Sequence, residues 1–148
     1  MATEKIIELD YGSNSWEDVL RHLSEKMVES GSVKSSYIDA VVEREKEFPT
    51  GLNTEGVGIA IPHTDAEHVI RDQIAVLRLK NPVTFLQMGD GEPVEAKLIF
   101  MLALTKPHEQ LSMLQKLVML IQDTVKVKQL LKLQDNSAVL TVLSDSGI

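Results

Sequence analysis

The sequence of 148 residues contains no cysteine. Disulfide bonds, thiolate nucleophiles and cysteine-ligated zinc are therefore excluded. Basic residues are also in deficit, because 15 Lys and Arg stand against 22 Asp and Glu and give a formal net charge of -7. Nucleic acids and anionic membranes attract basic protein faces, so this balance argues against both as partners.

Long apolar runs are missing as well. The two longest, LIFMLAL and LVMLI, fall far short of the ~18 residues of a membrane-spanning helix. The first residues, MATEKIIELDYGS, lack the basic start and long apolar stretch of a signal peptide. We therefore expect a cytoplasmic protein without direct membrane insertion, and the length suits a single domain over residues 1–148.

Strand-like and helix-like segments follow one another along the chain. The strand-like segments are 4–10, 57–61, 73–80, 81–87 and 94–105. The helix-like segments are 16–28, 36–48, 111–121, 125–133 and 137–145. This order predicts an α/β, single-domain layered fold with a mixed β-sheet flanked by helices. FPTGLNTEG is expected to form a loop, and the short connection from VGIAI to QIAVLRLK predicts that these strands are antiparallel neighbours.

One histidine stands out by its position. His63 follows the apolar segment 57–61 and Pro62, which cannot donate a hydrogen bond to a sheet and so marks the end of pairing. Reactive groups of α/β proteins gather at such strand ends. A neutral imidazole is both a nucleophile and a base near pH 7. By position alone, however, a structural or surface histidine remains the more common outcome.

A metal site is an alternative for the same stretch. His63, Asp65 and Glu67 alternate, so an extended backbone would place them on one face. Nitrogen and oxygen ligands suit zinc or manganese. His63 and His68 are five residues apart, which is a poor spacing for one face of a helix. A metal-dependent hydrolase using His63, Asp65 and His108 is the least favoured of the alternatives.

Two further residues are candidates for the same site. His108 follows the apolar run 98–104, so we expect it at a strand end, where it could meet His63 over one edge of the sheet. Arg44 lies late in the second helix, just before the loop that begins with FPTG, and Phe48 at the end of that helix is expected to face inward. The alternative for Arg44 is an exposed side chain paired with one of three neighbouring glutamates.

Three segments together resemble a known family. TEGVGIAIPHTD is similar to the active-site signature of the enzyme IIA component of the bacterial phosphoenolpyruvate–sugar phosphotransferase system (PTS), of the fructose/mannitol type. REKEFPTGL resembles the family's arginine segment, and KPHEQLSMLQKL resembles its second-histidine segment. EREKEFPTGL looks most like the galactitol-specific branch. The resemblance implies the fructose/mannitol-type IIA fold over nearly the whole chain.

The resemblance also implies a phosphoryl relay. His63 would accept a phosphoryl group from the phosphocarrier protein HPr and pass it to a cysteine of the IIB component, for uptake of a galactitol-like sugar or sugar alcohol. Arg44 and His108 would stabilise the phosphoryl group, Thr64 would be a weaker contact, and no metal or other cofactor is needed. The alternative is a free-standing regulatory protein of the nitrogen type, which acts by phosphorylation-dependent protein binding.

A relay needs weak and transient contacts between its proteins, which small interfaces provide. An apolar rim around the site would suit such contacts. We expect four residues in this rim, with a place in the core as the alternative for each: Leu52, Val57, Leu111 and Met113.

Overall fold

The computed structural model describes residues 3–148. Their strands form one sheet in the order β1-β4-β5-β3-β2. The strands are β1 (Glu4–Tyr11), β2 (Gly51–Thr54), β3 (Val57–Ala60), β4 (Gln73–Leu86) and β5 (Pro93–Ala103). Because β1–β4 and β3–β5 are parallel pairs while β2–β3 and β4–β5 are antiparallel, the sheet is mixed, as the sequence predicted.

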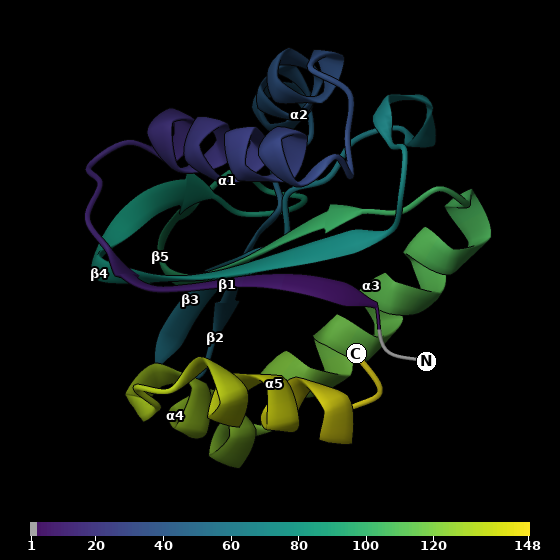
Figure 1. Ribbon diagram of the computed structural model, residues 1–148. Helices are drawn as coiled ribbons and strands as arrows, with labels where there is room; N and C mark the ends of the chain where they lie inside the picture. Colours follow the sequence, from purple (N-terminus) through teal and green to yellow (C-terminus); the bar gives the residue numbers. More distant parts are fainter. Residues whose placement is uncertain (1–2) are drawn as a thin grey trace.

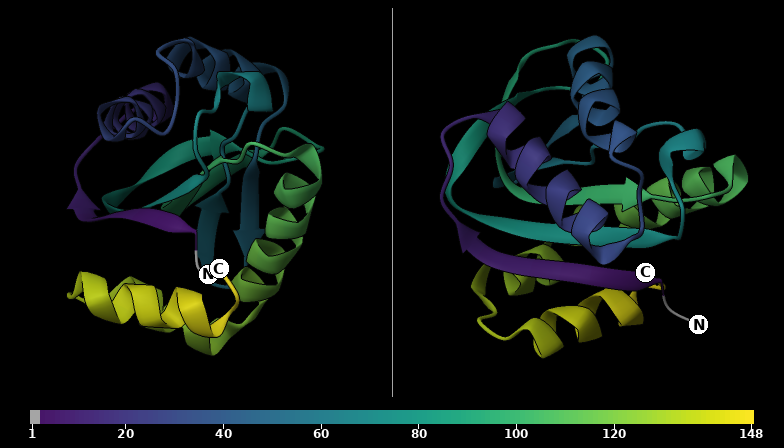
Figure 2. Two further views of the ribbon diagram at one scale, coloured as in Figure 1. Left: turned by 45° about the vertical axis from the view of Figure 1, so that its right-hand side comes forward. Right: turned by 45° about the horizontal axis from the view of Figure 1, so that its top comes forward.

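The helices cover both faces of this sheet (Figure 1 and Figure 2). On one face lie α1 (Trp16–Ser30) and α2 (Ser36–Glu47). The other face carries α3 (Pro107–Gln122), α4 (Thr124–Lys132) and α5 (Asn136–Asp145). A short 3-10 helix, η1 (Ala66–His68), lies between β3 and β4 in the chain.

Local sequence signals fix α1 at both ends. Ser15 caps the N-terminus, since its side chain accepts a hydrogen bond from the Asp18 N–H. Gly31 ends the helix in the left-handed conformation, at φ 82°. Between these caps the apolar residues recur at helical spacing and are buried against the sheet: Val19, Leu20, Leu23 and Met27.

The sheet separates two hydrophobic cores, which explains the long apolar run 98–104. Ile99, Met101 and Ala103 belong to the core beneath α1 and α2. Alternate residues of the same strand, including Phe100 and Leu102, belong to the core beneath α3, α4 and α5. A strand covered on both faces has no solvent side, so its sequence loses the polar alternation.

Two expectations about the sheet are wrong. FPTGLNTEG is not all loop, because β2 forms within it and pairs with β3 through a turn in which Gly56 has φ 90°. The segment GLNT has few residues with strong strand propensity, so sequence reasoning missed it. VGIAI and QIAVLRLK are not neighbours, because β5 lies between β3 and β4. The connection is short enough to join adjacent strands, yet it also suffices to pass one intervening strand.

A third expectation divides one strand into two. The segments 73–80 and 81–87 form one strand, β4, whose register with β5 shifts between Arg78 and Val83. The antiparallel pairing of β4 with β5 is as expected for the short turn between them.

One buried cation joins the sheet to the helical layer of α4. Arg78 of β4 is only 1% exposed. Its guanidinium donates to both carboxylate oxygens of Asp10, at 2.9 Å each, and to the carbonyls of Leu130 and Leu133. Those carbonyls lie at the C-terminal end of α4, where no backbone N–H follows to satisfy them. Arg78 therefore serves as the cap of α4, with a charge that suits this end of the helix dipole.

The backbone of Asp10 has an unusual conformation at this contact. Its φ of 61° lies in the left-handed region, at a break in register of the β1–β4 pairing. The hydrogen bonds from Arg78 hold the pKa of the Asp10 carboxyl below its usual value. The local kink in β1 thus brings a carboxylate to the one arginine that is buried in β4.

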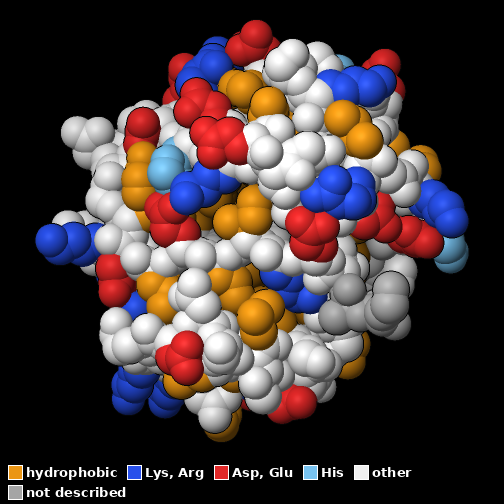
Figure 3. Space-filling model, viewed as in Figure 1, with side chains coloured by type: hydrophobic (Ala, Val, Ile, Leu, Met, Phe, Trp, Pro, Cys, Tyr) orange, Lys and Arg blue, Asp and Glu red, His pale blue; other side chains and the backbone are white. Residues whose placement is uncertain are grey.

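Charged groups of both signs are interspersed over the face shown in Figure 3, with hydrophobic side chains between them. Within residues 3–148, no helix combines the length and the apolar character that crossing a membrane requires.

Candidate active site

The backbone around His63 is held on two sides. Before it, the Ile61 N–H donates to Thr50, at 3.2 Å to the hydroxyl and 3.3 Å to the carbonyl. The Pro62 carbonyl accepts from the Leu102 N–H of β5 at 3.0 Å, and His63 itself forms a single bridge with Leu102. His63 therefore lies at the end of β3 while its backbone still follows β5, as its position after an apolar strand predicted.

A backbone carbonyl two residues earlier in the sequence orients the imidazole of His63. Its Nδ1 lies 2.9 Å from the Ile61 carbonyl oxygen, and a carbonyl can only accept. Nδ1 therefore carries the proton, which leaves the lone pair of the neutral ring on Nε2. Burial lowers the pKa of the His63 imidazole, the Ile61 carbonyl opposes this shift, and the nearby Arg44 charge lowers the pKa further. The lowered pKa thus favours the neutral ring at pH 7.

Arg44 reaches the site from the last turn of α2. Its Nη1 lies 3.5 Å from Oδ1 of Asp65, and its side chain is 38% exposed. The alternative pairing with a neighbouring glutamate is therefore not what the structure shows. Phe48, expected to face the core, is 54% exposed, and its ring centroid lies 4.9 Å from the Arg44 guanidinium carbon. This cation–π contact holds the guanidinium over the ring and leaves its N–H donors available.

The first turn of α3 touches the site through a residue that sequence reasoning missed. Nε2 of Gln110 donates to the carbonyl of Thr64 at 3.2 Å, and Thr64 is 5% exposed. A single glutamine two residues after a histidine gives no signal by itself, because only the packing of α3 against the strand end creates the contact. Thr64 follows His63 directly in the chain, and the hydrogen bond from Gln110 joins this position to α3.

His108 lies in the same turn, but the structure does not join it to His63. Its side chain is exposed. Within the described residues, no hydrogen bond or ion pair links the two imidazoles, although the elements that carry them meet at Thr64 and Gln110. His108 remains a prediction rather than an observed part of the site.

The metal alternative gains no support. Among residues 3–148, no group of three or more His, Asp or Glu side chains is arranged to hold a metal ion. Asp65 faces Arg44 instead, and His68 lies in η1, where its Nδ1 is 2.9 Å from the Ser36 hydroxyl.

The expected rim is only partly at the surface. Leu111 is 57% exposed, whereas Leu52 and Val57 are half-buried, and Val57 begins β3 at the end away from His63, so its place in the rim is wrong. Met113 is 8% exposed and belongs to the core with Leu117, so its place in the rim is wrong. Helical spacing explains the difference, because residues 113 and 117 share a face of α3 that Leu111 does not share.

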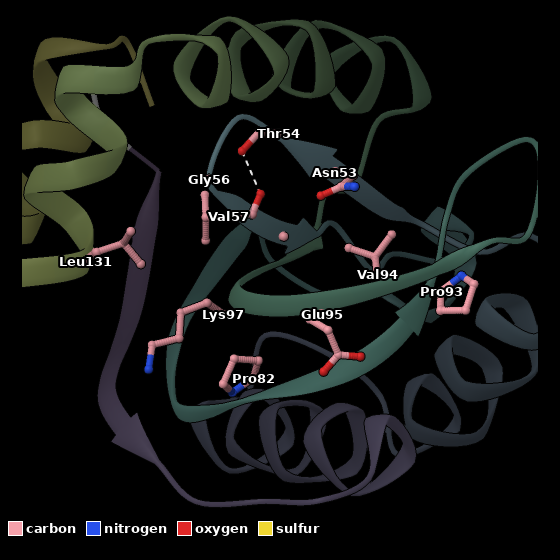
Figure 4. Close-up of a pocket in the computed structure, with 11 residues that line it drawn as sticks. Asn53, Thr54, Gly56, Val57, Pro82, Pro93, Val94, Glu95, Lys97 and Leu131 are labelled. Atoms are coloured by element: carbon pink, nitrogen blue, oxygen red, sulfur yellow. Dashed lines mark hydrogen bonds between the residues drawn. The ribbon is translucent and has the colours of Figure 1, made fainter.

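A separate hollow of about 620 Å³ lies at the other end of β3 (Figure 4). Its wall includes Asn53, Val57, Pro93 and Lys97, around the β2–β3 turn that the hydroxyl of Thr54 closes by donating to the Val57 carbonyl at 2.7 Å. His63 follows the opposite end of that strand. The candidate chemistry therefore belongs to the strand end that carries His63, and not to this hollow.

Comparison with known proteins agrees with the geometry. Residues 1–146 match the family described as phosphoenolpyruvate-dependent sugar phosphotransferase system, EIIA 2. The chain is 36% identical over 118 residues to the PTS system galactitol-specific EIIA component of Escherichia coli (strain K12), over 80% of this chain and 79% of that protein.

Solved structures share the fold. The crystal structure of IIA mannitol from Escherichia coli has a TM-score of 0.77 and 25% identity, covering 93% of this chain and 94% of that one. A complex of enzyme IIAMTL and phosphorylated enzyme IIBMTL from Escherichia coli also gives 0.77, at 24% identity and 94% of each chain. The protein therefore belongs to the EIIA 2 family of the phosphoenolpyruvate-dependent sugar phosphotransferase system, and it is a phosphotransferase component of such a system.

Proposed function

We propose that His63 carries a phosphoryl group from HPr to a cysteine of a IIB component, in the uptake of a galactitol-like sugar alcohol. The hydrogen bond from Nδ1 to the Ile61 carbonyl carries this proposal, because it leaves Nε2 as the nucleophile of a neutral ring. The Arg44 charge close to the same ring supports it.

Two in-line transfers make up the relay. Nε2 of His63 attacks the phosphorus of phosphohistidine in HPr, the N–P bond of the donor breaks, and its electron pair returns to the HPr imidazole. A thiolate of IIB then attacks the same phosphorus, and the electron pair of the broken bond returns to Nε2. The proton on Nδ1 stays in place throughout, held by the Ile61 carbonyl. Charge spreads over three equatorial oxygens in each transition state, so donors around the phosphorus matter most.

Arg44 is the main such donor in this proposal. Its planar guanidinium matches the oxygens of a phosphoryl group, and it can leave Asp65, whose side chain is largely exposed. His108 serves as a second donor once the phosphoryl group is present, and Thr64 contributes a minor contact from the adjacent position.

Transport is favoured over regulation by the relatives. The curated relative at 36% identity is a galactitol-specific EIIA component, which supports a sugar alcohol as the transported substrate. The structure of mannitol IIA in complex with phosphorylated IIB supports a IIB component as the acceptor.

The relay can be reconstituted with purified proteins. The protein is expected to gain acid-labile phosphate when incubated with phosphoenolpyruvate, enzyme I and HPr, and to lose it when a galactitol-type IIB is added. Omission of HPr serves as the control. No phosphate on the protein would contradict the proposal, and phosphate that IIB cannot remove would favour the regulatory alternative.

Arg44→Ala is expected to slow transfer by about 10²- to 10³-fold, as is typical for loss of one transition-state donor. Arg44→Lys should fall between this variant and the parent, because lysine keeps the charge but loses the fork of donors. Quenched-flow measurement of both half-reactions checks this. Lys46→Ala, which removes an exposed cation two residues away, is the matched control and should keep the parent rate. Equal rates for all three variants would leave Arg44 as a solvated helix charge.

A further inference from the structure

A buried carboxylate lies next to the proposed phosphoryl clamp. Glu45 is 6% exposed, and both of its carboxylate oxygens accept hydrogen bonds from Thr50: Oε2 from the backbone N–H at 2.7 Å and Oε1 from the hydroxyl at 2.8 Å. The ion pairs found within residues 3–148 do not include it. A buried carboxylate is costly unless hydrogen bonds satisfy it, and here one residue supplies two.

The hydroxyl of Thr50 links Glu45 to Ile61, the residue that follows β3. Because its proton points to Glu45, its lone pairs are free to accept the Ile61 N–H at 3.2 Å. The carboxylate therefore fixes which way the hydroxyl faces. A residue without such a partner could turn its own proton toward Ile61 and break the contact.

Ile61 completes the path to the ring. Its N–H is held by Thr50, and its carbonyl accepts the Nδ1–H of His63 at 2.9 Å. The next residue is Pro62, whose ring fixes its own φ and whose carbonyl is tied to β5. The acceptor that selects the tautomer of His63 is thus anchored on both sides, and one anchor leads back to Glu45.

The same carboxylate also fixes the end of α2. Arg44 and Glu45 are consecutive residues of the last helical turn, and Thr50 lies beyond the end of that helix. While Arg44 extends toward Asp65, Glu45 turns inward to Thr50. A single set of hydrogen bonds therefore joins the turn that carries the cation to the strand end that carries the nucleophile.

We propose that Glu45 and Thr50 are positioning residues, which hold His63 in its Nδ1–H tautomer and hold the Arg44 turn against the strand end. This inference rests on the proposed role of His63. Burial also raises the pKa of the Glu45 carboxyl and the Thr50 hydrogen bonds oppose that shift, so the carboxyl depends on these bonds to accept as a carboxylate.

The test compares Thr50→Val, which keeps the shape but removes the hydroxyl, with Thr50→Ser, which restores it. Glu45→Gln, which keeps the size of the side chain but brings an NH₂ group to a site with two donors, is the second variant. Nitrogen NMR of the His63 ring reports the tautomer in the unphosphorylated protein. Quenched flow with phospho-HPr reports the transfer rate.

In the parent and in Thr50→Ser, the ring should show a protonated Nδ1 and an unprotonated Nε2. In Thr50→Val and Glu45→Gln, the two nitrogen shifts should approach each other as the tautomers mix. Transfer should fall about 10- to 100-fold, the usual range for loss of a supporting contact, and Thr50→Ser should recover it.

A control separates positioning from stability. Val139→Ala removes buried volume in α5 and lowers stability, and it removes none of the hydrogen bonds that join Glu45, Thr50, Ile61 and His63. It should keep both the tautomer and the rate. If Thr50→Val and Glu45→Gln keep the parent tautomer and rate, or if they change no more than Val139→Ala does, the proposal is overturned. Because the tautomer is read without a phosphoryl donor, it tests positioning even if the parent accepts no phosphate from HPr.

Discussion

The His63→Ala variant is expected to take up no acid-labile phosphate from phosphoenolpyruvate, enzyme I and HPr, under conditions that label the parent fully. The reason is that Nε2 of His63 is the proposed nucleophile, and alanine offers no atom to form the N–P bond. Mass spectrometry of the intact protein, with peptide mapping under mildly alkaline conditions, measures the result. The variant should keep its fold, because the ring is only half-buried and its hydrogen bond is to its own chain.

His68 provides the matched control for this experiment. It is also half-buried, and its Nδ1 likewise has an oxygen partner, the Ser36 hydroxyl at 2.9 Å. Arg44, however, pairs with Asp65, and its charge lowers the pKa of His63. The proposed phosphoryl clamp therefore lies beside His63. His68→Ala should therefore be phosphorylated like the parent. Phosphate on His68 or His108 in the His63→Ala protein would contradict the assignment of the acceptor.

Arg78→Met should cause a large loss of stability although it lies outside the site. Methionine keeps an apolar stem in the sheet but leaves the Leu130 and Leu133 carbonyls without their donor. Loss of buried hydrogen bonds from a charged donor suggests a cost of about 3 kcal/mol in the free energy of unfolding. For a chain of this size, that corresponds to a fall of about 6–12 °C in Tm. Differential scanning calorimetry of the parent and the variant measures it.

Asp10→Asn separates the two halves of the Arg78 contact. Asparagine tolerates the left-handed backbone of Asp10, so only the exposed half of the ion pair is weakened. Its effect on Tm should be much smaller than that of Arg78→Met, since Asp10 is half exposed and its charge is screened by water. Equal losses from the two variants would show that the ion pair, and not the capping of α4, accounts for the stability.

The sequence predicted the parts of the site whose signal is local. His63 follows an apolar strand and a proline, and the order of elements predicts a mixed sheet between helices. Gln110 and the Glu45–Thr50 contact could not be found in this way, because each depends on which elements pack together. Glu45 and Ile61 are 16 positions apart in the sequence, and this separation does not indicate that both contact Thr50. The β2–β3 hairpin brings Thr50 and Ile61 together.

The errors have the same origin. The hydrophobic pattern marks a segment as strand or helix but does not determine which strands are neighbours, so it does not predict that β5 lies between β3 and β4. Phe48 reads as a core residue by type, but a nearby guanidinium holds its ring at the surface. The role of His108 stays a prediction, since the contact that the first turn of α3 makes with Thr64 comes from Gln110.

The sheet separates two cores, and the site uses residues from both sides of it. Arg44 comes from the layer of α2, the contact with Thr64 comes from the layer of α3, and His63 follows a strand of the sheet between them. In the proposed relay, phosphate capture therefore requires both helical layers to be in place. A newly made or damaged chain with only one layer in place has an imidazole but lacks part of its surroundings. Such a chain would not take phosphate from the proposed relay.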